Sequence, residues 1–141
     1  MTDNKSGEIL IIEDDKDIND LLATALSKVG YRTRQAWSGT EGELLLKLDR
    51  EAYALVLLDL MLPGLSGEEL LARIRQMDAS IPVIILTAKD ELDEKINLLV
   101  AGADDYITKP FEIKEVVARV AVQLRHAVAD VPSKSGQAGE N

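Results

Sequence analysis

The chain contains no cysteine. Disulfides, thiolate metal sites and cysteine nucleophiles are therefore excluded, and any metal or covalent chemistry must be based on oxygen atoms. Positive charge is also scarce, because 16 Lys and Arg stand against 25 Asp and Glu and give a net charge of -9. Such a domain is repelled by nucleic acid and by anionic membranes, so we expect this domain itself to contact neither.

The sequence has no apolar run close to the roughly 20 residues that a membrane-spanning helix needs. Its first eight residues are too polar for a secretory signal, and we expect a cytoplasmic protein. With 141 residues, 46% of them hydrophobic, the chain can bury the core of one domain. We expect this domain at 8–128, a disordered N-terminus at 1–7, and a linker or disordered tail at 129–141, where Pro, Ser, Gly and Gln replace the apolar pattern.

Strand-like and helix-like segments alternate about five times along the chain. The expected strands cover 9–12, 31–37, 53–59, 83–86 and 106–108. Apolar residues at helical spacing mark the helices between them, including Leu44, Leu45 and Leu48 in the second helix and Leu92, Ile96, Leu99 and Val100 in the fourth. Ser66 is an N-cap candidate, and Gly30 and Gly102 are C-cap candidates.

This alternation predicts an α/β fold: a doubly wound, five-stranded parallel sheet with helices on both faces. In such folds the functional site lies in the crevice at the carboxyl ends of the strands. The residues that end the first, third, fourth and fifth strands are Glu13 with Asp14, Asp59, Thr87 and Lys109. They converge if the strand order is flavodoxin-like, 2-1-3-4-5.

These strand ends form a set suited to phosphoryl chemistry. Carboxylates about 4 Å apart repel by roughly 4 kcal/mol at an effective dielectric constant near 20, so clustered Glu13, Asp14 and Asp59 need a shared cation or proton. A hard cation such as Mg²⁺ prefers oxygen ligands of this kind. Lys109 is placed to shield an incoming phosphoryl group, and Thr87 to donate its hydroxyl to that group. The implied product is an aspartyl phosphate on Asp59.

Four separated motifs occur in a recognisable order and spacing: Ile-Ile-Glu-Asp-Asp, Leu-Leu-Asp-Leu-Met-Leu-Pro-Gly, Ile-Ile-Leu-Thr-Ala and Ala-Asp-Asp-Tyr-Ile-Thr-Lys-Pro-Phe. With them the chain resembles the receiver domain of two-component response regulators from Glu8 to about Leu124. The resemblance implies that Asp59 accepts a phosphoryl group from a sensor histidine kinase. It implies Mg²⁺, with Mn²⁺ as an alternative, bound by Glu13 through water, Asp14, Asp59 and the backbone carbonyl of Met61. It also implies that Thr87 and Tyr106 are the switch pair and that Lys109 binds the phosphate.

The last motif and the following Glu-Val-Val-Ala-Arg-Val are most similar to the OmpR-like transcription-factor subfamily, whose receivers form homodimers through the fourth helix, fifth strand and fifth helix. The positions where that subfamily places ion-pairing residues are occupied here by Lys95, Asp105, Glu115 and Arg119. Val100 and Ala121 stand where it usually carries charges. A winged-helix DNA-binding domain normally follows such receivers, so we expect either an excised receiver or a stand-alone protein with another output.

Three other functions compete with a phosphorylation-controlled switch. A phosphatase or phosphomutase of the dehalogenase-like class needs a second aspartate two residues after the nucleophile, where this chain has Met61. A flavin or nucleotide module needs a phosphate-cradling loop after the first strand, where three acids stand instead. A degenerate receiver would lack some of the acids, Thr87 or Lys109. We therefore expect a regulatory domain that catalyses only its own phosphotransfer and slow dephosphorylation, controls dimerisation or a transcriptional output, and is not an ordinary enzyme.

Overall fold

The computed structural model describes residues 7–88 and 92–129, so the segments expected to be disordered lie almost wholly outside the described residues. In this part of the chain there are five strands: β1 (Glu8–Ile12), β2 (Thr33–Ala36), β3 (Tyr53–Asp59), β4 (Val83–Thr87) and β5 (Asp105–Thr108). The helices described are α1 (Lys16–Lys28), α2 (Gly39–Leu48), the short 3-10 helix η2 (Arg50–Ala52), α3 (Gly67–Met77), α4 (Leu92–Val100) and α5 (Ile113–Ala129).

The strands form one parallel sheet in the order β2-β1-β3-β4-β5, which confirms the flavodoxin-like arrangement. In the register of the central strands, Ile12 of β1 pairs with Leu58 of β3, and Asp59 pairs with Leu86 of β4. The strands therefore end almost level with one another. The residues that follow them meet at one edge of the sheet, as the sequence predicted.

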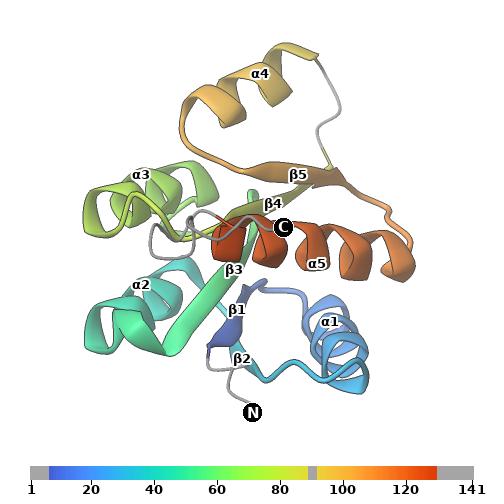
Figure 1. The fold of residues 1–141 in the computed structure, drawn as a ribbon. Helices are drawn as coiled ribbons and strands as arrows, with labels where there is room; N and C mark the ends of the chain where they lie inside the picture. Colours follow the sequence, from blue (N-terminus) through green and yellow to red (C-terminus); the bar gives the residue numbers. More distant parts are fainter. Residues whose placement is uncertain (1–6, 89–91, 130–141) are drawn as a thin grey trace.

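Helices cover both faces of the sheet (Figure 1). One core cluster packs β-strand side chains against α2, α3 and α4, and the other packs the alternate side chains against α1 and α5. In β3, for example, Val56 and Leu58 belong to the first cluster and Leu55 and Leu57 to the second. This alternation explains why β3 is an unbroken apolar run, since both of its faces are buried. Burying each such side chain contributes about 1.5–3 kcal/mol.

The helix ends follow the signals in the sequence. Ser66 caps α3 through a capping box with Glu69, which satisfies backbone N–H groups that have no partner in the first turn. Gly30 and Gly102, which follow α1 and α4, have φ angles of 102° and 116°. Because L side chains rarely adopt these values, both positions favour glycine and confirm the predicted C-terminal ends.

One expectation, the length of the second strand, needs correction. Strand β2 is shorter than the predicted 31–37 because the backbone N–H groups at both of its ends donate hydrogen bonds to residues of the neighbouring helices. The N–H of Tyr31 donates to Leu26 O of α1, and that of Trp37 donates to the Glu41 carboxylate of α2. In α2, Leu46 is buried, whereas two of the residues that marked the helix, Leu44 and Leu48, are exposed.

The buried face of α2 is explained by Gly42, which lies directly against the side chain of Ile12. A glycine adds no apolar side chain to the pattern, yet it allows the closest approach of helix and sheet. The buried face of α2 is therefore centred on Gly42 and Leu46 rather than on the leucines that dominate its periodicity.

Helix α4 carries most of its apolar residues on its outer surface. Leu98 is buried, whereas four others are exposed: Leu92, Ile96, Leu99 and Val100, the last at 82%. Among the described helices, none has the length and apolar character needed to cross a bilayer.

Candidate functional site

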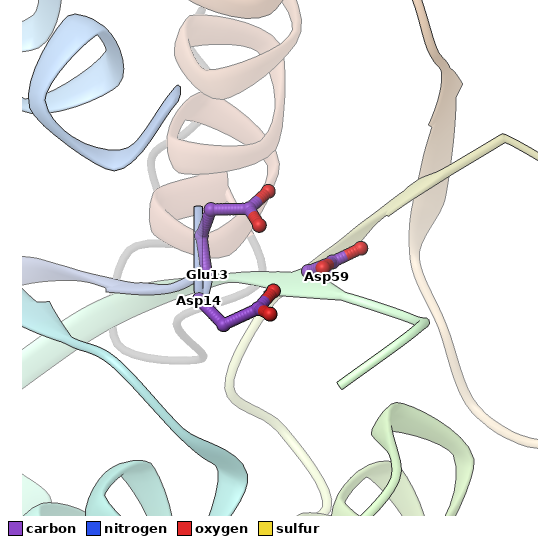
Figure 2. Close-up of side chains that lie close together, drawn as sticks. All are labelled: Glu13, Asp14 and Asp59. Carbon is purple, nitrogen blue, oxygen red and sulfur yellow. The ribbon is translucent and has the colours of Figure 1, made fainter. Parts of the chain in front are cut away.

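Three carboxylates meet at the carboxyl edge of the sheet. Glu13 and Asp14 follow β1, Asp59 ends β3, and one oxygen from each lies within 4.8 Å of the others. Figure 2 shows the side chains converging from the two strand ends. Glu13 and Asp59 are only 1% and 3% exposed, whereas Asp14 is exposed. The site therefore combines two buried carboxylates with one that faces solvent.

The turn that carries Glu13 and Asp14 is held by its own polar groups. The Glu13 N–H donates to Ala36 O at the end of β2 over 3.1 Å. The Glu13 carboxylate accepts from the N–H of Asp15 at 3.1 Å. The carboxylate of Asp15 then caps α1 by accepting from the N–H of Ile18 at 3.0 Å. The third acid of the run is thus a helix cap, while the first two belong to the cluster.

Lys109 supplies a positive charge to this cluster. Its Nζ lies 3.0 Å from Glu13 Oε1 and 3.2 Å from Asp59 Oδ1. Its backbone N–H donates to Thr87 O at 2.7 Å, which fixes the loop after β5 against the end of β4. A residue 96 positions from Glu13 in sequence is thereby brought into direct contact with it.

The protonation equilibria at the site reflect its excess of negative charge. Burial, reinforced by the charge of Asp59, raises the pKa of Glu13 from 4.5 to about 7, although the Asp15 N–H and Lys109 act in the opposite direction. Desolvation would lower the pKa of Lys109, but its carboxylate partners outweigh this effect and raise it. One lysine among three carboxylates leaves about two negative charges uncompensated. A divalent cation with oxygen ligands fits this charge and this donor set.

The backbone around Asp59 is closely packed. The N–H of Met61 donates to Asp59 Oδ1 at 3.3 Å. Gly67, the first residue of α3, lies so near that an added Cβ would be 2.6 Å from Asp59 O. Only glycine lets α3 begin there without displacing the end of β3. The side chain of Met61 is 60% exposed, and the role of its carbonyl as a metal ligand stays a prediction.

The expected switch residues lie on the strands next to this cluster. Thr87 is fully buried at the end of β4, one residue after the pairing partner of Asp59. Tyr106 on β5 is half-buried against the core beneath α4, and the Nζ of Lys95 lies 5.0 Å from the centroid of its ring. The two residues are thus on adjacent strands, where β4 pairs with β5. Their role as a switch pair stays a prediction.

The residues expected at a dimer face make contacts within the chain. Arg119 of α5 lies 2.9 and 3.0 Å from the two carboxylate oxygens of Asp105, and its Nε lies 3.1 Å from Glu115. These contacts join β5 to α5, and the role of the four residues in a dimer stays a prediction.

Sequence reasoning missed two polar residues behind the acid cluster, Asn19 and Gln35. Asn19 is fully buried on α1 and donates to the backbone carbonyls of Glu13, which follows β1, and Ala36, which ends β2. A signal was present, because Asn19 precedes Leu22 and Leu26 at helical spacing and therefore stands on the buried face. A polar residue in that position needs hydrogen-bond partners.

Comparison with known proteins identifies the same family that the motifs in the sequence resemble. Residues 9–121 match the model of the family described as the response regulator receiver domain. The uncharacterized transcriptional regulatory protein YkoG of Bacillus subtilis is 48% identical over 124 residues, which cover 86% of this chain and 52% of that protein. The phosphate regulon transcriptional regulatory protein PhoB of Pseudomonas aeruginosa is 45% identical over 119 residues, covering 83% and 51%. The chain thus spans about half the length of these curated relatives.

Solved structures agree with the sequence comparison. The receiver domain of the Francisella response regulator 1452 superimposes with a TM-score of 0.78 at 36% identity, covering 85% of this chain and 98% of that one. The response regulator DrrB, a Thermotoga maritima OmpR/PhoB homologue, gives a TM-score of 0.74 at 35% identity and covers 85% and 53%. These matches support the likeness to the OmpR-like subfamily.

Proposed function

The chain belongs to the response regulator receiver domain family, whose members are phosphoryl-accepting switches rather than classical enzymes, and from this premise we propose that Asp59 is the phosphoryl acceptor. The observation that carries the proposal is the surroundings of Asp59. It is a buried carboxylate at the end of β3, with Lys109 Nζ at 3.2 Å and two further carboxylates within 4.8 Å. A structural aspartate at a strand end does not need such a costly environment.

In the proposed reaction, a carboxylate oxygen of Asp59 attacks the phosphorus of a phosphohistidine on a sensor kinase. An O–P bond forms, the N–P bond of the donor breaks, and the leaving nitrogen takes up a proton from solvent. The Met61 N–H and Lys109 both bond Asp59 Oδ1 and hold the carboxylate in place. Lys109 also offsets the negative charge of the incoming oxygens. The acid that would speed hydrolysis in a dehalogenase-like enzyme is replaced by Met61, so the acyl phosphate is expected to persist.

Receiver domains bind Mg²⁺ through acidic residues, and we assign that role here to Glu13 through a water, Asp14, Asp59 and the carbonyl of Met61, with Mn²⁺ as an alternative ion. When bound, the cation supplies charge neutralisation between the attacking carboxylate and the phosphoryl oxygens. The support for this assignment is the excess negative charge of the cluster and the raised pKa of Glu13.

We further propose that phosphorylation changes the surface on α4, β5 and α5. Thr87 would donate its hydroxyl to a phosphoryl oxygen, and Tyr106 would follow into the space that this movement opens. Lys95 stacks on Tyr106, so a movement of the ring is communicated to α4. The exposed apolar residues of α4 and the ion pairs of Arg119 would then pack against a second copy of the chain.

The output proposed for the full protein is transcriptional, because both curated relatives named above are transcriptional regulatory proteins. In this proposal a sensor histidine kinase phosphorylates the domain in the cytoplasm. The phosphorylated domain then dimerises and controls a DNA-binding domain. This domain itself carries a net charge of -9 and is not expected to bind nucleic acid.

The test is intact mass spectrometry after incubation with phosphoramidate and Mg²⁺. The proposal expects one phosphoryl adduct on the wild type, none on Asp59→Asn and none in EDTA. An adduct that forms equally well on Asp59→Asn would overturn it. Glu51→Gln, which removes an exposed acid before the start of β3 at the opposite edge of the sheet, is the matched control and should be phosphorylated normally.

A further inference from the structure

The turn that presents Glu13 and Asp14 is tied to the rest of the fold by the backbone bond from Glu13 N–H to Ala36 O and by one buried amide. The Nδ2 of Asn19 donates to Glu13 O at 3.0 Å and to Ala36 O at 3.0 Å. It therefore joins the end of β1 to the end of β2 from beneath the acid cluster. The backbone N–H of Asn19 also donates to Asp15 O at 2.9 Å, so α1 is bonded to both ends of the acidic turn.

The orientation of that amide is set by Gln35 on β2. The Nε2 of Gln35 donates to Asn19 Oδ1 at 2.9 Å and to Asp20 Oδ1 at 2.8 Å. Because the oxygen of Asn19 faces this donor, its NH₂ group must face the two carbonyls. Asn19 is fully buried, and Leu, Ala or Asp at this position would leave Glu13 O and Ala36 O without these donors.

Three carboxylates that repel one another will separate unless the backbone that carries them is restrained. The strand ladder fixes Asp59, whereas Glu13 and Asp14 lie just beyond β1, where a single backbone bond, from Glu13 N–H to Ala36 O, extends the pairing with β2. Asn19 adds bonds to Glu13 O and Asp15 O, which restrain the turn on both sides of Asp14. We infer that Asn19, oriented by Gln35, is a positioning residue that holds Glu13 and Asp14 in place for the divalent cation before it binds. This inference rests on the proposed metal site and adds to it a residue that touches neither the cation nor the phosphoryl group.

The test is the dissociation constant for Mg²⁺, measured on the folded chain by isothermal titration calorimetry. Asn19→Ala should weaken Mg²⁺ binding by about 10- to 100-fold, the usual effect of losing a residue that orients metal ligands. Gln35→Ala leaves the amide of Asn19 in place but unoriented, and should weaken binding by a smaller factor. This second variant is half-buried on an edge strand and keeps the inference testable if Asn19→Ala does not fold.

The control is Leu22→Ala, which removes a fully buried side chain one turn further along the same helix. This variant is destabilised but keeps Asn19 and the acidic turn, so its Mg²⁺ affinity should match that of the wild type. Equal losses of affinity in Leu22→Ala and Asn19→Ala would mean that Asn19 acts only through stability, and would overturn the inference.

Phosphorylation by phosphoramidate gives a second measurement. The Mg²⁺ concentration for half-maximal rate should rise in Asn19→Ala by the same factor as the dissociation constant. The rate at saturating Mg²⁺ should stay close to the wild-type rate, because Asp59 and Lys109 are untouched. If Asn19→Ala binds Mg²⁺ as tightly as the wild type, the inference is wrong while the proposed function stands. If the wild type itself does not bind Mg²⁺, the proposed metal site is wrong.

Discussion

Replacing Asp14 by Asn should make the metal-free domain more stable while removing its response to Mg²⁺. Its carboxylate lies within 4.8 Å of those of Glu13 and Asp59, where two charges repel by about 3.5 kcal/mol at an effective dielectric constant of 20 and about 0.9 kcal/mol at that of water. Asp14 is exposed, and within the described residues no ion pair joins it to Lys109. The repulsion from each of the two other carboxylates therefore falls in the lower part of this range, and the substitution breaks no ion pair there. We expect a gain of about 2 kcal/mol in unfolding free energy in EDTA at low salt.

Magnesium should bring the wild type close to the stability of Asp14→Asn. At a concentration 100 times its dissociation constant, the ion stabilises the wild type by about 2.7 kcal/mol, and it should stabilise Asp14→Asn by less than about 1 kcal/mol. Urea unfolding at pH 8, with EDTA and with Mg²⁺, measures both values. Glu51→Gln is the control and should stay within about 0.5 kcal/mol of the wild type under both conditions. An Asp14→Asn variant that is less stable in EDTA, or equally stabilised by Mg²⁺, would refute the argument from repulsion.

Three further predictions concern the other residues of the site. In EDTA, the stability of the wild type relative to Glu13→Gln should fall by about 3 kcal/mol as the pH rises from 4.5 to 8. The reason is that the pKa of Glu13 in the folded state, about 7, lies above the ordinary 4.5, so the folded state favours the protonated carboxyl. A constant difference in urea unfolding across this pH range would contradict the prediction. Lys109→Gln should slow phosphorylation by phosphoramidate about 10²- to 10³-fold, since it removes the cation beside Asp59, and an unchanged rate by intact mass would exclude a role for the lysine. Thr87→Ala should still take up the phosphoryl group, but its phosphorylation-dependent dimerisation should weaken about tenfold because one hydrogen bond to a charged group is lost. Sedimentation measures the dimerisation, and a wild-type value would show that Thr87 is not part of the switch.

The sequence was most informative where one physical cause acts alone. The apolar run before Asp59 predicted β3 over its observed length, because a strand buried on both faces needs such a run. The acids, Thr87 and Lys109 could be assigned to one edge of the sheet because parallel strands all end there. Their contacts depend on register and loop conformation, which local pattern does not determine.

The sequence was less informative where contacts depend on distant segments. The role of Asn19 follows from Ala36 and Gln35, which belong to the next strand, so nothing within α1 indicates which groups its amide would meet. The buried face of α2 could not be read from its leucines, because Gly42 packs against the sheet without adding to the apolar pattern. The exposure of the apolar residues of α4 likewise could not be distinguished from core packing by periodicity alone.

The most direct test of the central claim is chemical identification of the phosphorylated side chain. Borohydride reduces an aspartyl phosphate to homoserine, so the chain can be phosphorylated with phosphoramidate and Mg²⁺, reduced, digested and sequenced by tandem mass spectrometry. In the wild type, the account predicts homoserine at residue 59 and at no other acidic position of the cluster. Homoserine at Asp14, or 5-hydroxynorvaline from a reduced glutamyl phosphate at Glu51, with aspartate intact at residue 59, would contradict it. So would a phosphoryl group that resists reduction on another type of side chain.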